Sequence, residues 1–260
     1  MAFSRDDISM GRRTPEHVAA RLEELILEGV FRPGQLLPSE RRLCERLGVS
    51  RASLREGLRI LRSKAIINTR QGHGSTVASL LPMHQQSPLM HLFNDHPRTL
   101  FDLLEVRALL EGESAYLAAR RGTSMDRVLI TRRYREMAAY AAASPDELEV
   151  EHLARLDHAF HLAISQASHN PVLVHTLQSL TDLLLSSVFA SVKHLYHRPG
   201  PREMINQQHA RLHESVVSGD AEQARQIALE HLTSISELLR ELEAEHDRLE
   251  RSAMRLEQWQ

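Results

Sequence analysis

The sequence has a single cysteine, Cys44, and few aromatic residues. One cysteine cannot form an internal disulfide, which excludes a disulfide-stapled secreted domain and favours a reducing, cytoplasmic location. The first residues carry Asp6 and Asp7 and no apolar core, so we expect no signal peptide. No apolar run approaches the length of a membrane-spanning helix, so we expect no membrane association. The scarcity of aromatic residues, beside abundant Ala and Leu, favours helices over an all-β fold.

Charge is divided unevenly along the chain. Residues 1–79 hold 14 Arg and Lys against 9 Asp and Glu, whereas residues 80–260 hold 18 against 25, and the two net charges of +5 and −7 sum to −2 for the 260 residues. A chain of this length has two domains as its natural expectation. A basic first part attracts polyanions through the release of their counterions.

The stretch from Pro38 to Lys64 has the pattern of a helix-turn-helix. Ser39 and Ser50 are N-cap residues, and Gly48 suits the left-handed residue just past a helix end. The two short helices therefore meet near Gly48, and each has leucines on one face at helical spacing. The outer face of the second helix is basic, with Arg51, Arg55, Arg59 and Arg62. Such a face suits a DNA major groove, although Arg-rich helix faces are also found simply in contact with solvent.

The flanks complete a winged helix-turn-helix over residues 15–79, after a flexible tail at residues 1–14. Thr14 and Pro15 open an earlier amphipathic helix that runs up to Gly29, and Leu36-Leu37 is a short apolar link. Two short β-type runs, 66–70 and 75–78, are joined by glycines that permit a tight hairpin. In this wing Arg70, Gln71 and His73 supply hydrogen-bond donors, and Gly72 permits close approach to a backbone.

The remainder is predicted to be mainly α. Residues 80–98 contain three prolines and no sustained periodicity, and we interpret them as a linker. Residues 99–250 are predicted to form an all-α bundle of six or seven helices. The expected helices begin at Thr99, at Met125, after Ser144-Pro145, at Pro171, at Glu203 and at Ala221. The last carries one heptad-spaced apolar stripe but not a second, so residues 251–260 are expected to be a frayed tail rather than a coiled coil.

Spacing also predicts a metal site in the bundle. Asp157 and His161 are four residues apart and share a helix face. His209 lies about ten residues before the Gly219 turn and His231 about twelve after it, so the two imidazoles are nearly level in an antiparallel hairpin. Three imidazoles and a carboxylate suit Zn²⁺, Ni²⁺ or a similar ion. The alternative is chance, since the chain has 16 histidines.

Residues 15–78 resemble the DNA-binding domain of the GntR family of bacterial transcription regulators. The resemblance is carried by GxxLPSERxL at 34–43, LGVSR at 47–51, LRE at 54–56 and RQGHGSTV at 70–77. It implies that Arg41, Arg51 and Arg55 contact bases and phosphates, Ser50 a phosphate, and Gln71 with Gly72 the minor-groove edge. Gly57 and Ala65 depart from the family pattern, which favours Ala and Gly at those two positions.

Residues 99–245 resemble the FCD effector domain of the FadR branch of that family. The motif DxxFHxxIxxASxN at 157–170, followed by two later histidines, implies that Asp157, His161, His209 and His231 bind the metal. Arg107 matches an arginine that pairs with a carboxylate effector, and its alternative is a salt bridge with Glu111. Stretches such as ASHNPVLVHTLQSLTDLLLSSVFASV resemble those of glycolate-responsive members of this branch, and the resemblance implies glycolate or a similar small 2-hydroxy acid as effector, with Asn170 as a further effector residue.

These patterns predict a ligand-responsive transcription regulator rather than an enzyme. A single small helix-turn-helix reads few base pairs, so we expect a homodimer on two half-sites of double-stranded DNA. One alternative is a metalloenzyme with a nucleic-acid module. Against this alternative, no carboxylate near the proposed metal ligands stands out as a general base. Another is a purely structural helical protein, which leaves the Arg-lined helix and the wing without a role.

Overall fold

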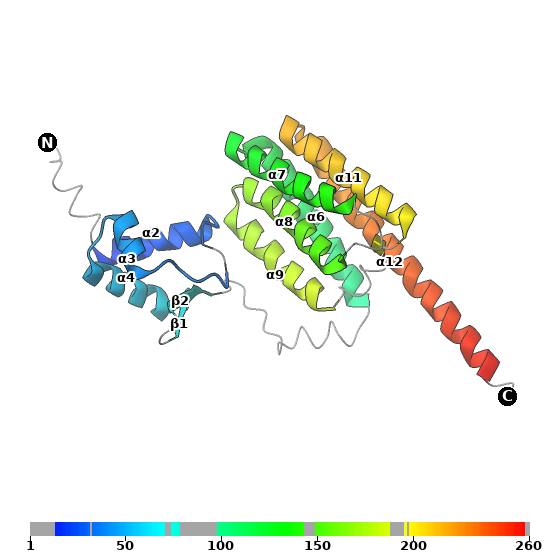
Figure 1. The fold of residues 1–260 in the computed structure, drawn as a ribbon, viewed down its shortest axis with the longest axis horizontal. Coiled ribbons are helices and arrows are strands. Elements are labelled where there is room, and N and C mark those ends of the chain that lie inside the picture. The colour runs from blue at the N-terminus through cyan, green and yellow to red at the C-terminus, as the bar shows by residue number, and fades with distance from the viewer. Residues whose placement is uncertain are drawn as a thin grey trace. The chain divides into compact units, whose positions relative to one another are not determined.

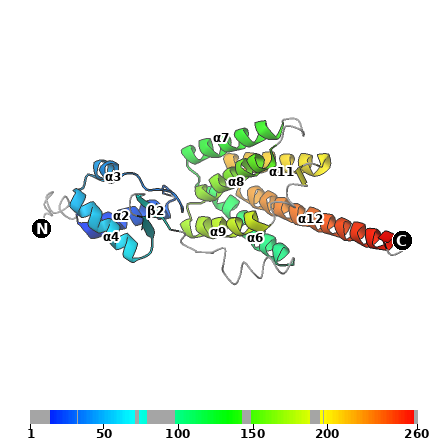
Figure 2. The ribbon, with the colours of Figure 1, turned by 60° about the horizontal axis from the view of Figure 1, so that its bottom comes forward.

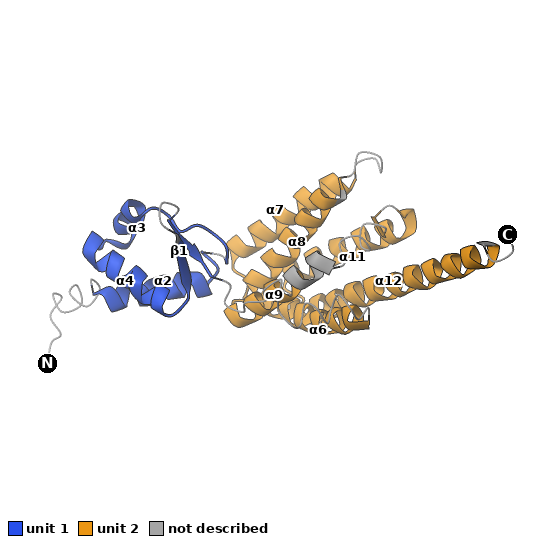
Figure 3. Ribbon diagram, turned by 90° about the horizontal axis from the view of Figure 1, so that it is seen from below, with its two compact units in different colours: residues 1–83 blue, residues 84–260 orange. Residues whose placement is uncertain are grey.

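The structure separates the chain into two compact units. The computed structural model describes residues 14–31, 33–70, 74–78, 98–142, 149–187, 195–196 and 198–257. Unit 1 comprises residues 1–83 and unit 2 residues 84–260 (Figure 3). The predicted linker, residues 80–98, lies outside the described residues except for Arg98, as do the predicted wing-tip residues Gln71, Gly72 and His73.

Unit 1 is a winged helix-turn-helix, as predicted. Its elements are α2 (Pro15–Leu27), α3 (Glu40–Leu47), α4 (Arg51–Ser63), β1 (Ile67–Arg70) and β2 (Gly74–Val77) (Figure 1). The two strands pair antiparallel, with Ile67 opposite Val77. Helix α2 packs against α4, α4 also contacts β1, and the buried apolar residues of unit 1 form one core.

The helix ends of unit 1 follow local sequence signals. The side chains of Thr14, Ser39 and Ser50 accept hydrogen bonds from backbone N–H groups in the first turns of α2, α3 and α4. Gly48 ends α3 with φ of 65°, the left-handed conformation that glycine adopts without strain. The predicted caps are therefore confirmed.

A third backbone segment pairs with the wing, and the sequence did not predict it. The segment interpreted as a short apolar link makes an isolated bridge between Leu36 and Thr76. The Leu37 N–H donates to the Ser75 carbonyl at 2.8 Å, and the Gly34 N–H donates to the Val77 carbonyl at 2.8 Å. The outer edge of β2 thus receives backbone partners from a segment some forty residues earlier, which no local pattern could indicate.

The structure explains Gly57, where the family pattern favours alanine. A Cβ atom at this position would lie 2.9 Å from Val18 Cγ1 and 3.1 Å from the Pro15 carbonyl oxygen. Helix α4 therefore approaches the start of α2 too closely for a side chain. The helix-propensity cost of glycine, about 1 kcal/mol, is accepted in exchange for this close packing.

Ala65 shows the opposite departure. It has φ of 58°, in the left-handed region that an L-residue enters at a cost. Its N–H donates to the Arg62 carbonyl at 3.0 Å and closes the end of α4 before β1 begins. The turn therefore keeps a glycine-like conformation although it lacks the glycine.

Unit 2 is a helical bundle, as predicted, and six helices fall within its described residues. They are α6 (Arg98–Arg121), α7 (Ser124–Ala141), α8 (Val150–Ala167), α9 (Pro171–Ser187), α11 (Pro199–Ser218) and α12 (Ala221–Glu257). Helix α6 runs beside α12 and also contacts α8, α9 and α11, so it is the central helix of the unit (Figure 2). In the described part of the chain no helix is long and apolar enough to span a membrane.

The start of α11 and the end of α12 differ from those expected. Helix α11 begins at Pro199 rather than at Glu203, because a proline in the first turn needs no N–H partner and its φ already suits a helix. Helix α12 continues to Glu257, beyond the other helices of its unit (Figure 1), so residues 251–257 of the expected frayed tail are helical.

Candidate DNA-binding surface and candidate metal centre

The predicted DNA-contacting arginines of α3 and α4 lie on the surface of unit 1. The side chains of Arg41 and Arg55 are 73% and 69% exposed, and Arg51 is also exposed. Arg41 pairs with Glu45 at 2.9 Å, and Arg55 Nε donates to Glu40 at 2.9 Å. Exposed pairs of this kind contribute little to stability. The two arginines can therefore exchange carboxylates for phosphates at small cost.

Ser50 stands at the start of the basic helix. Its Oγ accepts a hydrogen bond from the Ser53 N–H at 3.1 Å and lies 2.9 Å from Ser53 Oγ. The free N–H groups and positive dipole end of α4 begin at this residue. The serine thus shapes an N-terminus that suits a phosphate group.

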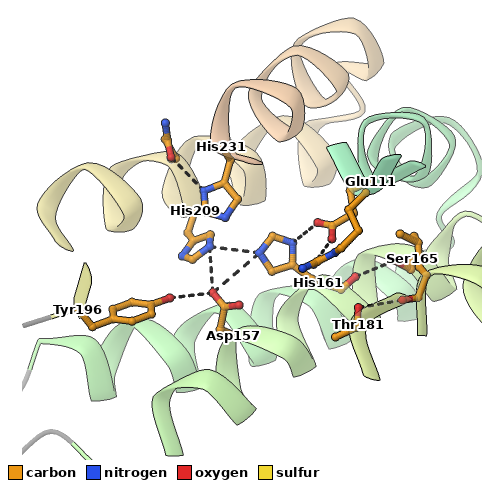
Figure 4. A network of polar contacts seen from close by, with 11 residues as sticks. Glu111, Asp157, His161, Ser165, Thr181, Tyr196, His209 and His231 are labelled. Atoms are coloured by element: carbon orange, nitrogen blue, oxygen red, sulfur yellow. Dashed lines mark hydrogen bonds and ion pairs between the residues drawn. The ribbon is translucent and has the colours of Figure 1, made fainter. Parts of the chain in front are cut away.

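In unit 2 the structure brings together all four predicted metal ligands (Figure 4). Asp157 and His161 lie one turn apart on α8, and His209 comes from α11 and His231 from α12. One ring nitrogen from each histidine lies within 4.8 Å of the others. Asp157 Oδ1 is 3.2 Å from His209 Nε2 and 4.0 Å from His161 Nε2. The chain reverses at Gly219, which has φ of 87°, between α11 and α12. His209 and His231 therefore lie at the same level of the helix pair, as the residue count predicted.

The spacing of these donors fits a metal ion. His161 Nε2 and His209 Nε2 are 3.2 Å apart. Two nitrogens bound to one ion at about 2.0–2.1 Å would be separated by about 3.0–3.4 Å. The His161–His209 pair therefore has the separation of two ligands of one ion, and three imidazoles with a neighbouring carboxylate form a donor set suited to a borderline divalent ion.

Neighbouring side chains hold two of the three imidazoles in ligand-competent orientations. His161 Nδ1 lies 3.1 Å from Glu111 Oε2, and His231 Nδ1 lies 3.0 Å from Gln208 Oε1. An acceptor at Nδ1 fixes the tautomer whose Nε2 lone pair is free to bind a metal. The Tyr196 hydroxyl donates to Asp157 Oδ1 at 3.2 Å and orients the carboxylate. Sequence reasoning did not find Gln208 or Tyr196, because an ordinary Gln or Tyr carries no signal of its own.

Burial keeps two of the imidazoles neutral. It lowers the pKa of His209 and His231 well below the usual value, and the neighbouring imidazoles lower it further. At His161 burial also lowers the pKa, but the Glu111 carboxylate outweighs it and the net shift is upward. Burial and Asp157 raise the pKa of Tyr196 well above its ordinary value, so this group remains a neutral donor.

Arg107 makes an ion pair with Glu111, as the structural alternative for this residue anticipated. Its side chain is only 15% exposed, and its Nε atom is buried without a hydrogen-bond partner among the described residues. Glu111 thus links Arg107 to His161, and the Nε–H of Arg107 is a donor without an acceptor among the described residues.

Glu111 is the main residue that sequence reasoning missed at the centre. From the sequence, Glu111 was expected only as a salt-bridge partner of Arg107. In the structure it is also buried and contacts His161. Burial opposes its ionisation, yet Arg107 and His161 hold the pKa of Glu111 well below its usual range. A carboxylate so stabilised as an anion is a poor base.

Asn170, the further effector residue that the sequence predicted, directly precedes α9. Its Oδ1 accepts the Leu173 N–H at 3.2 Å, which caps α9, and its own N–H donates to Ser168 Oγ at 3.2 Å. The structure thus gives Asn170 a capping contact, and its predicted role toward the effector stays a prediction.

Comparisons with known proteins agree with this architecture. Residues 14–77 match the model of the bacterial regulatory proteins of the gntR family, and residues 102–234 match the FCD domain. The Glc operon transcriptional activator of Escherichia coli (strain K12) is 54% identical over 242 residues, which cover 93% of this chain and 95% of that protein. The chain belongs to the GntR family.

Other members extend the comparison. The HTH-type transcriptional regulator LutR of Bacillus subtilis (strain 168) is 31% identical over 216 residues, covering 83% of this chain and 96% of LutR. The solved structure of a Streptococcus agalactiae GntR protein has a TM-score of 0.52 at 26% identity, covering 86% of this chain and 99% of that one. This GntR-family chain is therefore a DNA-binding transcription regulator with an FCD domain, and not an enzyme.

Proposed function

We propose that this GntR-family regulator binds a small carboxylate, glycolate or a similar 2-hydroxy acid, at a divalent metal site and alters its DNA binding in response. Zn²⁺ or Ni²⁺ would be held by Asp157, His161, His209 and His231. When bound, the ion would supply an open coordination position for an oxygen of the acid. The observation that carries this proposal is the convergence of three imidazoles and a carboxylate from three helices.

Arg107 is the proposed partner of the effector carboxylate. Its guanidinium lies beside Glu111, which contacts the ligand His161, and its buried Nε lacks a partner among the described residues. A planar guanidinium binds a carboxylate through paired N–H donors. The choice of glycolate rests on the sequence resemblance, and the similarity to the Glc operon activator favours activation as the output.

At the DNA end, Arg41, Ser50, Arg51 and Arg55 are the proposed major-groove and phosphate contacts, with Gln71, Gly72 and His73 at the wing. We infer a homodimer because two half-sites double the sequence that is read. Operator DNA in a bacterium lies in the cytoplasm, which is the proposed place of action. Effector binding would bias unit 2 between two packings and so change the spacing of the two winged helices.

The test measures the affinity of the purified protein for its own upstream DNA at a stated salt concentration. The titration is made with and without glycolate, before and after removal of metal by a chelator. We expect a glycolate-dependent change in affinity that chelation abolishes and that added Zn²⁺ or Ni²⁺ restores. A glycolate response that survives complete removal of metal would contradict the proposed role of the ion.

A further inference from the structure

Glu111 is a buried acid placed between the proposed effector partner and a proposed metal ligand. Its side chain is 8% exposed, and its two oxygens are divided between neighbours. Oε1 accepts from the Arg107 guanidinium, and Oε2 lies 3.1 Å from His161 Nδ1 (Figure 4). Because the Glu111 carboxylate contacts both Arg107 and His161, its charge acts on a ligand bound at either residue.

The charged groups at this centre nearly cancel. Glu111 and Asp157 each carry a negative charge, Arg107 carries a positive charge, and an imidazole that binds a metal is neutral. These described groups together leave one negative charge, which a divalent ion would convert to one positive charge. A single monocarboxylate would then bring the buried centre to neutrality.

A second carboxylate on the ligand would find no further cation among the described residues that line the cavity beside Glu111. A small cavity next to Glu111 is lined on α6 by Ser114 and Ala115 and on α8 by Ile164 and Ser165, and His161 also borders it. Apart from His161, Glu111 is the only acid or base in its described lining, and it is negative. The Ser114 hydroxyl, 1% exposed and without a described partner, is polar but uncharged.

We propose that Glu111 makes this site selective for monocarboxylates over dicarboxylates of similar size. The inference rests on the proposed function and adds the charge class of its ligand. A buried charge without a partner is costly. A dianion would leave the centre with one uncompensated negative charge, and it should therefore bind more weakly than a monocarboxylate. Glu111 acts through the charge of the site and through Arg107 and His161, and is therefore a specificity residue.

The test compares the affinities of the zinc-loaded protein for glycolate, glycerate and tartronate by calorimetry. Tartronate carries a second carboxylate where glycerate carries a neutral hydroxymethyl group of similar size. We expect Glu111→Gln to shift the ratio of tartronate to glycolate affinity toward tartronate by about tenfold or more, and to leave the ratio of glycerate to glycolate unchanged. Glu113→Gln is the matched control, since Glu113 lies on α6 in an exposed pair with Arg225.

A second variant keeps the test independent of the folding of the first. Arg107→Gln removes a positive charge, so the same ratio should move away from tartronate although glycolate also binds more weakly. Metal content, measured by mass spectrometry, is compared across all variants, since Glu111→Gln also alters the acceptor at His161 Nδ1.

Two results would overturn the inference. If Glu111→Gln weakens all three acids by the same factor, Glu111 only positions its neighbours, and the proposed function stands without the charge selectivity. If the zinc-loaded wild-type protein binds none of the three acids, the proposed function fails and the selectivity fails with it.

Discussion

The two units differ in where their proposed functional residues lie, at the surface in unit 1 and in the interior in unit 2. In unit 1 the arginines of α3 and α4 are exposed above a core of apolar side chains, among which Leu22, Leu54 and Leu61 are fully buried. In unit 2 the functional residues are part of the interior, since His209 and His231 are 2% and 4% exposed. A surface that contacts a large polyanion can vary without disturbing the fold, whereas a buried centre for a small anion is bound up with packing.

The largest expected effect breaks the buried centre. His209→Ala should lower metal affinity by more than about 100-fold, because it removes a ligand whose loss exceeds that of an orienting neighbour. It should also lower the melting temperature of the metal-free protein, because the ring is part of the interior. Metal content after dialysis and thermal unfolding measure the two effects.

His246→Ala is the matched control, since its ring is 72% exposed on α12 and pairs with Glu250. Neither metal content nor stability should change in this variant. Equal metal retention in His209→Ala and His246→Ala would remove His209 from the ligand set.

The next effect tests the exposed surface. Arg55→Ala should weaken binding to operator DNA by about 10- to 100-fold, the range for loss of one good arginine contact. Stability should hardly change, because the exposed pair with Glu40 contributes little. Fluorescence anisotropy at fixed salt measures the affinity, with the exposed Arg132→Ala of α7 as the control.

Acidification should weaken metal binding in unit 2 through the protonation of His161. Burial lowers the pKa of His161, but Glu111 and Asp157 outweigh burial and raise it, so in the metal-free protein the pKa lies above the usual value for histidine. The proton must leave before Nε2 can bind a metal. As pH falls through this titration, metal affinity should therefore fall by about tenfold per pH unit, before the two histidines with lowered pKa begin to compete.

Metal titrations in steps from about pH 8 to about pH 5.5 give the slope. Glu111→Gln removes the main group that raises the pKa, so the decline should then begin at lower pH. An identical onset in both proteins would show that Glu111 does not control this proton.

The smallest effect concerns packing in unit 1. Gly57→Ala should destabilise the protein by about 1–2 kcal/mol, because overpacking against Val18 and the Pro15 carbonyl outweighs the better helix propensity of alanine. Urea unfolding measures the change. The functional surface of α4 faces away from this contact, so any change in DNA affinity should be small.

Ala65→Gly provides a comparison of opposite sign. Ala65 already has φ of 58°, which glycine adopts without strain, so this substitution should stabilise unit 1 by about 1 kcal/mol. Were Gly57→Ala instead to stabilise the protein, the close approach of α2 and α4 would not be the reason for the glycine.

Local signals were enough to predict most of unit 1. The serine and threonine caps, the left-handed Gly48 and the leucine spacing act within a few residues, and each is present in the structure. The bundle and the level of His209 with His231 also followed from periodicity and a residue count along one hairpin. The pairing of the Leu36 segment with β2 could not be predicted in this way, because its hydrogen bonds join segments distant in the sequence.

The sequence by itself determined the helix caps of unit 1 and the apolar faces, since each depends on neighbours within one or two turns. It also supplied the four proposed donors of the centre, which helix spacing and the position of one turn were enough to suggest. Only the tertiary structure decided how Glu111 divides its oxygens between Arg107 and His161, why Gly57 has no side chain, and that Asn170 caps a helix. These outcomes depend on which helices approach each other and how closely, and side-chain packing across helices leaves no periodic trace in the sequence.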